Sequence, residues 1–422
     1  MTKFLLLIYK ILTILLLPII FIIVIIRIFQ KKEISNRIHE RFAFSKIKRP
    51  PGKLIWINAS SIGEYLATVS LIKKIRKINP KTKILLTTNT KTSALLAKKI
   101  TNKNIIHQFT PQDNPLIIKK FLHYWRPSLV LWMESEFWPI ILDEIKKCNI
   151  EIILLNGRMS DKSFNNWSYF KFFFKKIISN FSLILTMSKI DEKNFKNLGA
   201  KKINFIGNLK FCNEKEIYNI KLEKKIKKLI KNRPVWLAAS THPGEELLAS
   251  KIHNNLKKNL KINNLLTVIV PRNIKRSLKI KKEITSFIAN TKLFKSNSIT
   301  KKTEIIIDDS IGQLEIWYKN INTVFLGKSL PPKGGQNPIE PAKNGCVIIS
   351  GKMSNFKEIE KEMIYKKCLL SVNNYSEFYS KIDDCFKKKN YIKKIKLNSK
   401  RYVKSKSFIL DKTIKKIKNY LP

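Results

Sequence analysis

The chain contains few acidic residues. Its 422 residues include 30 Asp and Glu against 83 Lys and Arg, so its formal net charge is +53. A charge this positive indicates an anionic partner: nucleic acid, an anionic membrane surface or an anionic substrate. The alternative is a compositional bias, since Lys, Ile and Asn are over-used throughout the chain, loops included. Apolar residues make up 44% of the chain, which is enough for large cores and argues against disorder.

Cysteine is also scarce, and its five positions are widely spaced. No two cysteines form a CxxC pair. An odd number at such spacings argues against a disulfide framework and against a zinc site, and it fits a reducing compartment. We therefore expect no metal and no bound cofactor. The five residues are Cys148, Cys212, Cys346, Cys368 and Cys385.

Charge is almost absent near the N-terminus. Residues 4–26, FLLLIYKILTILLLPIIFIIVII, include one charged side chain, Lys10. At 1.5 Å per residue this run can cross a hydrocarbon core of ~30 Å. It is longer than the apolar region of a cleaved signal peptide and does not end in small residues. The run therefore predicts a retained membrane-anchor helix at residues 1–34. Pro18 is expected to kink it, so it could span the membrane or lie half-buried in it.

Basic residues follow the anchor. Arg27, Lys31 and Lys32 lead into a strongly basic body. The positive-inside rule places this body on the cytoplasmic side of the membrane. A second segment of interest is the aromatic and basic run at residues 164–181, FNNWSYFKFFFKKIISNF. It is a candidate for contact with acyl chains or headgroups, and core packing is the alternative.

From residue 54 onward, short apolar runs alternate with helical patterns. The first series includes KLIWINA, KILLTTN, PSLVLWME, EIILLNG and FSLILTMS, and the second includes PVWLAAS, LLTVIVP, TEIIIDD, NTVFLG and CVIISG. Strand–helix–strand repetition predicts parallel sheets wound with helices. We therefore expect an α/β fold with two Rossmann-like domains and a cleft between them. A polar, Lys-rich helix separates the two series, so the predicted domains are residues 35–212 and 213–422.

Ligands of open parallel sheets sit beyond the carboxyl ends of the strands, so the turns after the strands are the places to search. In the first domain, NASSIGEYLA follows the strand LIWIN. Its small residues allow a substrate to approach the backbone. Glu64 falls in the first turn of the next helix, where the helix dipole favours an acid and would keep it ionised. Such a carboxylate could accept a proton from a substrate hydroxyl, and an acid that serves only the dipole is the alternative.

The turn MESEFWP closes the strand SLVLW with two acids, Glu134 and Glu136. Strand-end carboxylates of this kind can bind sugar hydroxyls or order a basic neighbour. The alternative is that they serve the start of the following helix. Arg158, which follows the strand EIILLN, is a candidate partner for one of them in a structural ion pair.

In the second series the loop AASTHPGEE, residues 238–246, follows an apolar strand. Ser240 and Thr241 are good N-caps, and Pro243 suits the first position of a helix. The two acids that follow complement the helix dipole. Free N–H groups at such a helix start are suited to an anion. His242 adds little by itself, because a lone histidine is more often structural.

A glycine-rich turn, LGKSLPPKGGQNPIEPAKNG, follows the strand NTVFLG and holds four of the 12 glycines. Gly334 and Gly335 allow positive φ angles and a close approach of the backbone to a phosphate. Asn337 can cap the next helix, and Pro338 can start it. Glu340 lies one turn further and could bind a ribose diol.

Arg272 is the last candidate. It lies in IVPRN, at the end of the strand LLTVIV. It could face a nucleotide phosphate or stack on a base. In a chain with 83 Lys and Arg, an ordinary surface charge is the alternative.

Taken together, these segments resemble the Kdo transferases, the 3-deoxy-D-manno-octulosonic acid transferases of lipopolysaccharide synthesis. The resemblance covers about residues 37–356. It implies a GT-B fold, CMP-Kdo as donor, the lipid A precursor lipid IVA as acceptor, and inversion at the anomeric carbon. The segments that carry it, in the family's order, are WINASSIGEYLATVSLIKKI, PQDNPLIIKKFLHYWRPSLVLWMESEFWPIILDEI, LLNGRMSDKS, GNLKF, WLAASTHPGEE, VPRNIKR and GGQNPIEPA.

The resemblance also implies roles for single residues. Glu64 matches the family's proton acceptor, which would take the proton of the acceptor's 6'-hydroxyl as that oxygen attacks the Kdo ketal carbon. Arg272 and loop N–H groups would stabilise the departing CMP phosphate, so no metal is needed. The residues that match the CMP-binding segments are Pro271, Arg272, Ile311, Gly312, Gln313, Asn337, Pro338, Ile339 and Glu340.

The chain departs from the family pattern at several positions. Asn273 and Gln336 stand where the family usually has His, and Lys328 stands where it usually has a second Gly. Pro139 is followed by two isoleucines in place of a PNL-type stretch. Asn and Gln keep hydrogen bonding but cannot transfer a proton as His does. These changes therefore bear on donor affinity more than on the type of reaction.

The implied acceptor is an anionic, acylated lipid, which fits both the anchor and the basic body. We therefore expect the enzyme at the cytoplasmic side of the inner membrane, with no nucleic-acid partner. One rival keeps the fold and uses another nucleotide sugar, such as a UDP-sugar. Another is a basic, membrane-tethered nucleic-acid-binding protein, which would show a steep salt dependence and no need for Glu64. The sequence contains no recognition helix, zinc finger or aromatic RNA-binding motif.

Overall fold

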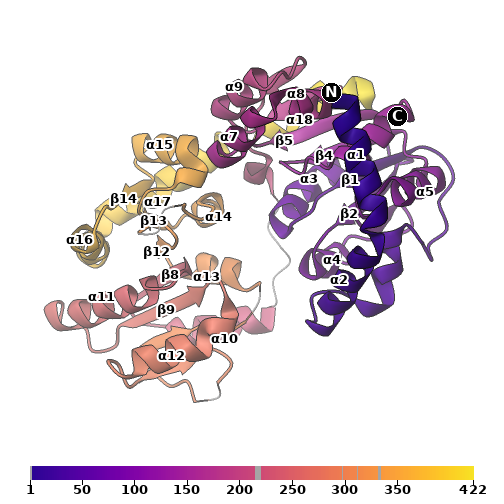
Figure 1. Ribbon diagram of the computed structural model, residues 1–422. Coiled ribbons are helices and arrows are strands. Elements are labelled where there is room, and N and C mark those ends of the chain that lie inside the picture. Colours follow the sequence, from indigo (N-terminus) through magenta and orange to yellow (C-terminus); the bar gives the residue numbers. More distant parts are fainter. Residues whose placement is uncertain (1, 214–219, 297, 311, 331–333) are drawn as a thin grey trace. The chain divides into compact units, whose positions relative to one another are not determined.

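The structure is a computed structural model that describes residues 2–213, 220–296, 298–310, 312–330 and 334–422. The chain forms two compact units. The first comprises Met1–Glu214 and Ser407–Pro422, and the second comprises Lys215–Lys406. Each unit contains one seven-stranded parallel sheet with helices packed against it (Figure 1). The predicted α/β class, with two Rossmann-like units, is therefore confirmed.

Seven strands form the sheet of the first unit, in the order β3-β2-β1-β4-β5-β6-β7. Every pairing in it is parallel. All residues of β1 and β4 are buried, as expected for central strands that are covered on both faces. The strands are β1 (Leu54–Asn58), β2 (Lys83–Thr88), β3 (Ile105–Phe109), β4 (Leu129–Met133), β5 (Glu151–Gly157), β6 (Leu183–Thr186) and β7 (Ile203–Phe205).

Local signals set where the helices of this unit begin. Ser61, Asn114 and Ser188 each accept a backbone N–H at the start of a helix, as N-cap residues do. The helices between the strands are α3 (Ile62–Ile78), α4 (Lys91–Ala97), α5 (Pro115–Trp125), α6 (Pro139–Lys147), α7 (Asp161–Tyr169), α8 (Lys171–Ile178) and α9 (Lys189–Asn197), with the 3-10 helices η1 (Ser35–Phe42) and η2 (Leu209–Cys212).

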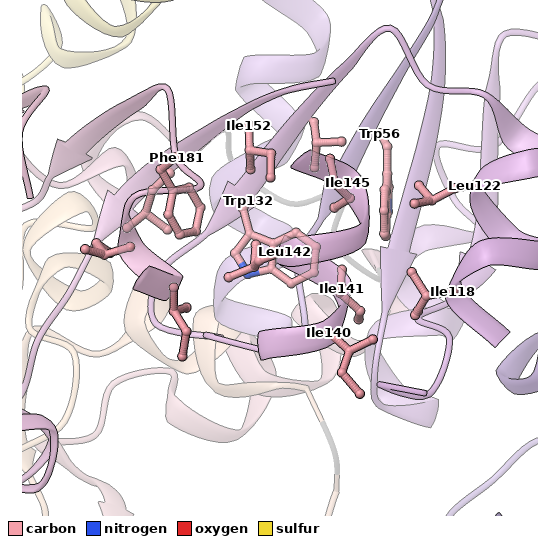
Figure 2. Packing of buried hydrophobic residues seen from close by; sticks show 14 of the residues in the cluster. Trp56, Ile118, Leu122, Trp132, Ile140, Ile141, Leu142, Ile145, Ile152 and Phe181 are labelled. Carbon is pink, nitrogen blue, oxygen red and sulfur yellow. The ribbon is translucent and has the colours of Figure 1, made fainter. Parts of the chain in front are cut away.

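Two tryptophans from adjacent strands lie at the centre of the first core. Trp56 on β1 and Trp132 on β4 pack edge to face, with ring centroids 5.7 Å apart. Aliphatic side chains of α5 and α6 cover them, among them Ile118, Leu122 and Ile141 (Figure 2). This packing fixes β1 and β4 to each other, and both strands lead into turns that carry acids.

The sheet of the second unit is also parallel, in the order β10-β11-β9-β8-β12-β13-β14. Its core includes Phe325 and Phe378, stacked with centroids 4.2 Å apart. Its strands are β8 (Val235–Thr241), β9 (Leu266–Pro271), β10 (Thr291–Leu293), β11 (Ile305–Ile307), β12 (Thr323–Leu326), β13 (Val347–Ser350) and β14 (Leu369–Ser371). Its helices are α10 (Ile220–Ile230), α11 (Glu245–Asn259), α12 (Ser277–Thr285), α13 (Leu314–Asn320), α14 (Ile339–Lys343), α15 (Lys357–Tyr365), α16 (Tyr375–Lys387) and α17 (Lys389–Lys404), with the 3-10 helices η3 (Ile274–Arg276) and η4 (Ser354–Phe356).

The last segment of the chain belongs to the first unit, which corrects the predicted second domain of 213–422. α18 (Ile409–Ile417), followed by η5 (Lys418–Tyr420), packs on α3 and η2. Ile409 and Ile417 are buried there, and Asp411 pairs with Lys74 at 2.7 Å. The amphipathic pattern of α18 shows that it needs an apolar partner, but nothing local in the sequence says which unit supplies it.

The apolar N-terminal run forms two helices. α1 (Thr2–Leu15) and α2 (Leu17–Phe29) meet at a bend of 57°. Pro18 lies in the first turn of α2, where it cannot donate the hydrogen bond that would continue α1. The described part of the chain has no single helix that is long and apolar enough to cross a membrane, although the bent pair meets the length and composition together. The single anchor helix is thus corrected to a bent pair, and the bend lies at Pro18 as predicted.

Candidate active site

In both sheets the strand order reverses at one point. β1 lies between β2 and β4 in the first sheet, and β8 lies between β9 and β12 in the second. Open parallel sheets bind their ligands beyond the carboxyl ends of the strands at such a reversal. The turns to examine are therefore those after β1 and β4, and those after β8, β9 and β12.

Glu64 lies in the first turn of α3, directly after β1, as predicted. The Ser60 backbone N–H donates to one carboxylate oxygen at 2.8 Å, and the Ser61 hydroxyl donates to the other at 2.9 Å. The side chain is only 6% exposed. Glu64 is therefore held in a fixed position at the carboxyl end of β1.

Burial raises the pKa of Glu64 to about 8, and the carboxylates of Glu134 and Glu136 act in the same direction. The hydrogen bonds from Ser61 and Ser60 oppose this shift but do not cancel it. The expectation that the helix dipole keeps Glu64 ionised is therefore wrong, because desolvation outweighs a dipole effect of at most ~2 kcal/mol. A carboxyl group with a pKa near neutrality is suited to accept a proton from a substrate.

Glu134 lies at the end of β4 with two partners that sequence reasoning missed. Lys210 Nζ lies 2.5 Å from Glu134 Oε1, and Asn156 Nδ2 donates to the same oxygen at 3.2 Å. Lys210 also lies against the start of α3, since a Cβ added to Gly63 would be 3.8 Å from Nζ. The lysine thus joins the acids at the reversal of the first sheet. Its one signal in the sequence was the GNLKF segment, because a single lysine does not stand out in a chain this rich in lysine.

Glu136 lies a short way along the same turn. The Trp138 indole N–H donates to its carboxylate at 2.7 Å, and the Trp132 indole donates to its backbone carbonyl at 2.5 Å. Burial raises the pKa of Glu136 as well. An ion pair between Arg158 and one of these acids stays a prediction.

A chain of polar side chains supports the turn after β1. The Asn89 backbone N–H and side-chain amide each donate to Ser60 at 3.1 Å, to its carbonyl and hydroxyl respectively. Arg41 in η1, only 5% exposed, donates to the Asn89 carbonyl at 2.6 Å. Glu33 pairs with Arg41 at 3.0 Å, and Arg27 of α2 pairs with Glu33 at 2.8 Å. The backbone that carries the candidate base is thus linked by hydrogen bonds to the N-terminal helix pair.

In the second unit, the loop AASTHPGEE differs from the predicted helix start. Ser240 and Thr241 belong to β8, and α11 begins at Glu245. The prediction that these residues cap the helix and that Pro243 opens it is therefore wrong. The strand continues because its neighbour holds it: the Thr241 carbonyl accepts the backbone N–H of Arg272 at 3.0 Å.

Glu245 fixes the turns after β8 and β12 to each other. Its carboxylate accepts the backbone N–H groups of His242, Lys328 and Ser329 at 2.8, 2.9 and 3.2 Å. Gly327 lies so close that an added Cβ would be 2.6 Å from a Glu245 oxygen. Of these three N–H groups, the one of His242 belongs to the loop that was expected to bind an anion, and it is occupied by Glu245.

Positive charge gathers around His242 at the same strand ends. Burial lowers the pKa of His242, and the cations Lys328, Arg272 and Arg276 act in the same direction against the opposing effect of Glu246. Arg276 is paired with Glu246 at 2.9 Å. Arg272 is exposed, and no carboxylate in the described residues forms an ion pair with it. Arg272 and Lys328 are therefore placed to neutralise an anion such as a nucleotide phosphate.

The glycine-rich turn has the backbone that its sequence predicts. Gly334 and Gly335 have φ angles of 153° and 73°. A Cβ on Gly335 would lie 2.8 Å from the Met353 Cα, so glycine is required there. Lys328, where a glycine is expected from the resemblance, also has a positive φ, 59°. Its carbonyl accepts the Gly335 N–H at 2.7 Å, which closes the turn.

The helix after Asn337 begins one residue later than predicted, because Pro338 is its N-cap and not its first residue. The Asn337 side-chain oxygen accepts the Ile339 N–H at 3.1 Å, and its amide donates to Glu340 at 3.3 Å. α14 starts at Ile339, one residue after Pro338. Gln336 Nε2 lies 3.4 Å from His242 Nε2, so this segment lies beside the turn after β8.

The remaining donor-binding candidates end β9 and follow β11. Pro271 is the last residue of β9 and is buried. Gly312 has a φ angle of 74°, Gln313 precedes α13, and Ile311 lies outside the described residues. Asp308 holds this turn, accepting the Ser310 N–H at 2.8 Å. In the described parts of the chain, no group of three or more His, Cys, Asp or Glu side chains could hold a metal ion.

Known proteins are similar to this chain in sequence and in fold. The family profile described as 3-deoxy-D-manno-octulosonic-acid transferase (kdotransferase) matches residues 36–213. Over 419 residues the chain is 33% identical to the 3-deoxy-D-manno-octulosonic acid transferase of Rickettsia bellii, which covers 98% of this chain and 99% of the relative. The chain belongs to the Kdo transferase family. It is therefore a glycosyltransferase, and Kdo is the sugar that it transfers.

A second relative agrees with this assignment, and two solved structures share the fold. The Kdo transferase of Haemophilus influenzae is 31% identical over 353 residues, which is 81% of each chain. A glycosyltransferase from Rickettsia africae has a TM-score of 0.62 at 16% identity, covering 88% of this chain and 99% of its own. The S. aureus MnaA–UDP co-structure has a TM-score of 0.60 at 13% identity, covering 88% and 97%. These two solved structures show the fold, which is GT-B-like.

Proposed function

We propose that this Kdo transferase moves Kdo from CMP-Kdo to the 6'-hydroxyl of lipid IVA, with inversion at the anomeric carbon. The observation that carries the proposal is Glu64, a buried carboxyl with a raised pKa at the reversal of the first sheet. A single displacement needs a base for the acceptor proton and positive charge for the leaving group. Glu64 can serve as the base, and Arg272 and Lys328 can supply the positive charge.

The acceptor step uses Glu64 as the general base. The 6'-hydroxyl oxygen attacks the anomeric carbon of Kdo, and its proton passes to a Glu64 carboxylate oxygen. Lys210, beside Glu134 and the start of α3, is a cation that can attract the anionic sugar. Glu134 and Glu136 are the acids available to bind sugar hydroxyls.

The donor step uses the turns at the end of the second sheet. As the bond between the anomeric carbon and the phosphate oxygen breaks, negative charge develops on CMP. Arg272 and Lys328 neutralise this charge, with His242 and Gln336 beside them as hydrogen-bonding groups. Glu340, held by Asn337, is placed to accept the ribose hydroxyls.

We infer that the enzyme works at the cytoplasmic face of the inner membrane. Lipid IVA is an anionic lipid with acyl chains, so the enzyme must meet it at a bilayer. The net charge of +53 and the apolar helix pair α1–α2 support this location. Nothing in these features calls for nucleic acid.

Mass spectrometry of lipid IVA after incubation with CMP-Kdo tests the proposal. The wild-type enzyme should add one or more Kdo masses, and the Glu64→Ala variant should add none while keeping its melting temperature. Transfer by both proteins would support the assigned reaction but show that Glu64 is not needed for it. No transfer by a folded, membrane-bound wild type would reject the donor or the acceptor.

The rival donor is tested in the same reaction mixture. A UDP-sugar replaces CMP-Kdo, and binding of CMP and UDP is compared by calorimetry. We expect the enzyme to bind CMP and not UDP. We also expect the Arg272→Ala variant to bind CMP more weakly than the wild type. Preference for UDP would favour the rival donor class.

A further inference from the structure

Apart from the exposed Lys3, helix α1 places its polar side chains toward the protein and most of its apolar side chains away from it. Tyr9, Lys10 and Thr13 lie on the face that meets the first unit, and Tyr9 packs against its core. A helix on the surface of a soluble protein has the reverse arrangement, with its apolar stripe inward. The outward face of α1 is therefore built for surroundings less polar than water.

The inward polar groups have specific partners on the body. Lys10 Nζ lies 2.6 Å from Asp143 and 2.6 Å from Glu144, both on α6, and its side chain is only 14% exposed. The Tyr9 hydroxyl donates to Asp113 at 3.0 Å. These bonds attach the middle of α1 to the body, and α1 also packs against α5, α6 and α8.

The backbone of α1 takes part as well. The Asn114 side-chain amide, at the start of α5, donates to the Thr13 carbonyl at 2.9 Å. Figure 1 shows α1 running beside α5 on the outside of the first unit. The helix is thus docked on the body, with its hydrogen bonds at Tyr9, Lys10 and Thr13.

The outward residues form a broad apolar surface over both helices. Leu15 is 68% exposed and Phe29 is 82% exposed, values that an aqueous surface would penalise. The exposed apolar residues are Phe4, Leu5, Leu7, Ile8, Ile11, Leu12, Ile14, Leu15, Leu16, Ile19, Phe21, Ile22, Ile23, Ile26 and Phe29.

α8 packs against α1, and the corner between α7 and α8 carries further exposed aromatic residues. Tyr169 and Phe172 there are 85% and 72% exposed. The lysines of α8 at positions 171, 175 and 176 are exposed among these rings. Aromatic rings interleaved with lysines fit the boundary between acyl chains and anionic headgroups.

We propose that α1, α2 and the α7–α8 corner form one lipid-facing surface that lies in the leaflet of an anionic bilayer, with the helix pair docked on the first unit and not projecting from it as a separate span. A separate span would draw Lys10 away from two carboxylates into hydrocarbon, which is costly. The 57° bend at the junction also suits a pair that follows the body more than a straight crossing.

This surface is independent of which sugar and acceptor the enzyme uses, so its tests need no activity. The full chain is reconstituted in vesicles of phosphatidylethanolamine and phosphatidylglycerol. A carbodiimide, which joins an amine directly to a carboxylate in contact with it, is added, and the linked peptides are identified by mass spectrometry. We expect an amide between Lys10 and Asp143 or Glu144 in the membrane-bound protein.

A matched linkage controls for the chemistry. Lys147 lies 3.0 Å from the same two acids within α6, so its linkage should form whether or not α1 is docked. Lys147 linkage without any Lys10 linkage would show that α1 leaves the body in the membrane, and it would overturn the proposal.

A lipid-soluble carbene probe then maps the surface. Label on the outward residues of α1 and α2 and on Tyr169 or Phe172, with none on Thr13, is the expected result. Label all around α1 and none at the α7–α8 corner would indicate an isolated span. If the whole surface were protected from the probe and crosslinked dimers formed, a second copy of the chain would cover this surface. That result would also overturn the proposal.

Two lysine variants complete the test. Lys10→Leu should lower the melting temperature of the vesicle-bound protein by about 2–4 °C, because Asp143 and Glu144 lose a buried cation. Lys3→Leu, at an exposed position of the same helix, should leave it unchanged. An unchanged or higher melting temperature for Lys10→Leu contradicts the docked arrangement.

Discussion

Glu64 combines two hydrogen bonds from its own turn with burial beside Glu134 and Glu136. The folded protein therefore keeps it protonated up to about pH 8. As a general base it must be ionised, so kcat/KM should rise with pH and level off above about pH 8. Initial rates at low substrate from about pH 6 to pH 10 would measure this profile. A flat profile across that range would contradict the role of Glu64 as the base.

Glu64 also makes the stability of the folded protein depend on pH. Stability should fall as pH rises, whereas kcat/KM should increase. Because the folded-state pKa lies above that of the unfolded chain, the stability contributed by protonated Glu64 is lost as pH rises through about 8. Glu64→Gln should therefore raise the melting temperature by about 2–4 °C at pH 9 and by little at pH 5. Thermal unfolding of Glu192→Gln, a surface variant of the same unit, serves as the control. A shift for Glu64→Gln that is equal at both pH values would reject the linkage.

At Lys328 the backbone conformation favours glycine, whereas the charge of the side chain favours binding of the donor. Its φ of 59° disfavours a side chain by about 1–2 kcal/mol, whereas its ammonium group adds to the positive charge around His242. Lys328→Gly should therefore stabilise the second unit slightly and weaken CMP binding several-fold. Calorimetric titration with CMP and a thermal melt check the two effects. Tighter CMP binding by the variant would contradict the proposed role of this lysine.

At the scale of elements, η1 supports the turn that carries the base. Arg41 donates a hydrogen bond to the Asn89 carbonyl, and Asn89 donates two hydrogen bonds to Ser60. Arg41→Ala should let this turn relax and lower kcat by about 100-fold with little change in KM, because a small misplacement of a catalytic group has that order of effect.

Arg49→Ala is the matched control for this prediction. Arg49 also bonds backbone carbonyls of the first unit, among them that of Trp125 at 2.8 Å, but it does not contact Asn89 or Ser60. Its loss should cost stability without a selective loss of kcat. Equal losses of kcat in the two variants, measured on folded protein, would show that Arg41 acts through general stability alone.

Strand and helix positions were the most predictable part of this fold. Runs such as LIWIN and LVLWM are buried along their whole length, so local apolarity was sufficient to locate β1 and β4. The extent of β8 was less predictable. Ser240 and Thr241 have the composition of a helix cap, yet the pairing of Thr241 with Pro271 of β9, across a register shift at Ser240, continues the strand. Pairing partners lie far away in sequence, so local patterns cannot reveal where a strand stops.

At the scale of the whole molecule, the chain ends in the unit where it began. Ile409 lies against Gly207, where an added Cβ would be 2.7 Å from its side chain. Ile409→Ala should therefore destabilise the first unit by about 2–5 kcal/mol, although it lies close to the C-terminus. Thermal melts of the full chain measure this, with Lys412→Ala on the exposed side of the same helix as the control. Equal effects of the two changes would contradict the packing of α18.

The sequence alone determined the α/β class, the strands, the acidic turn at Glu64 and the family resemblance. These depend on local apolar patterns and on motif order, both of which can be read along the chain. The tertiary structure decided the protonation of Glu64, the placement of Lys210 beside Glu134, the occupied N–H groups around Glu245 and the return of residues 407–422. Each of these depends on burial or on a partner that is distant in sequence. Desolvation and long-range contacts exist only after folding, so they cannot be predicted from a local sequence pattern.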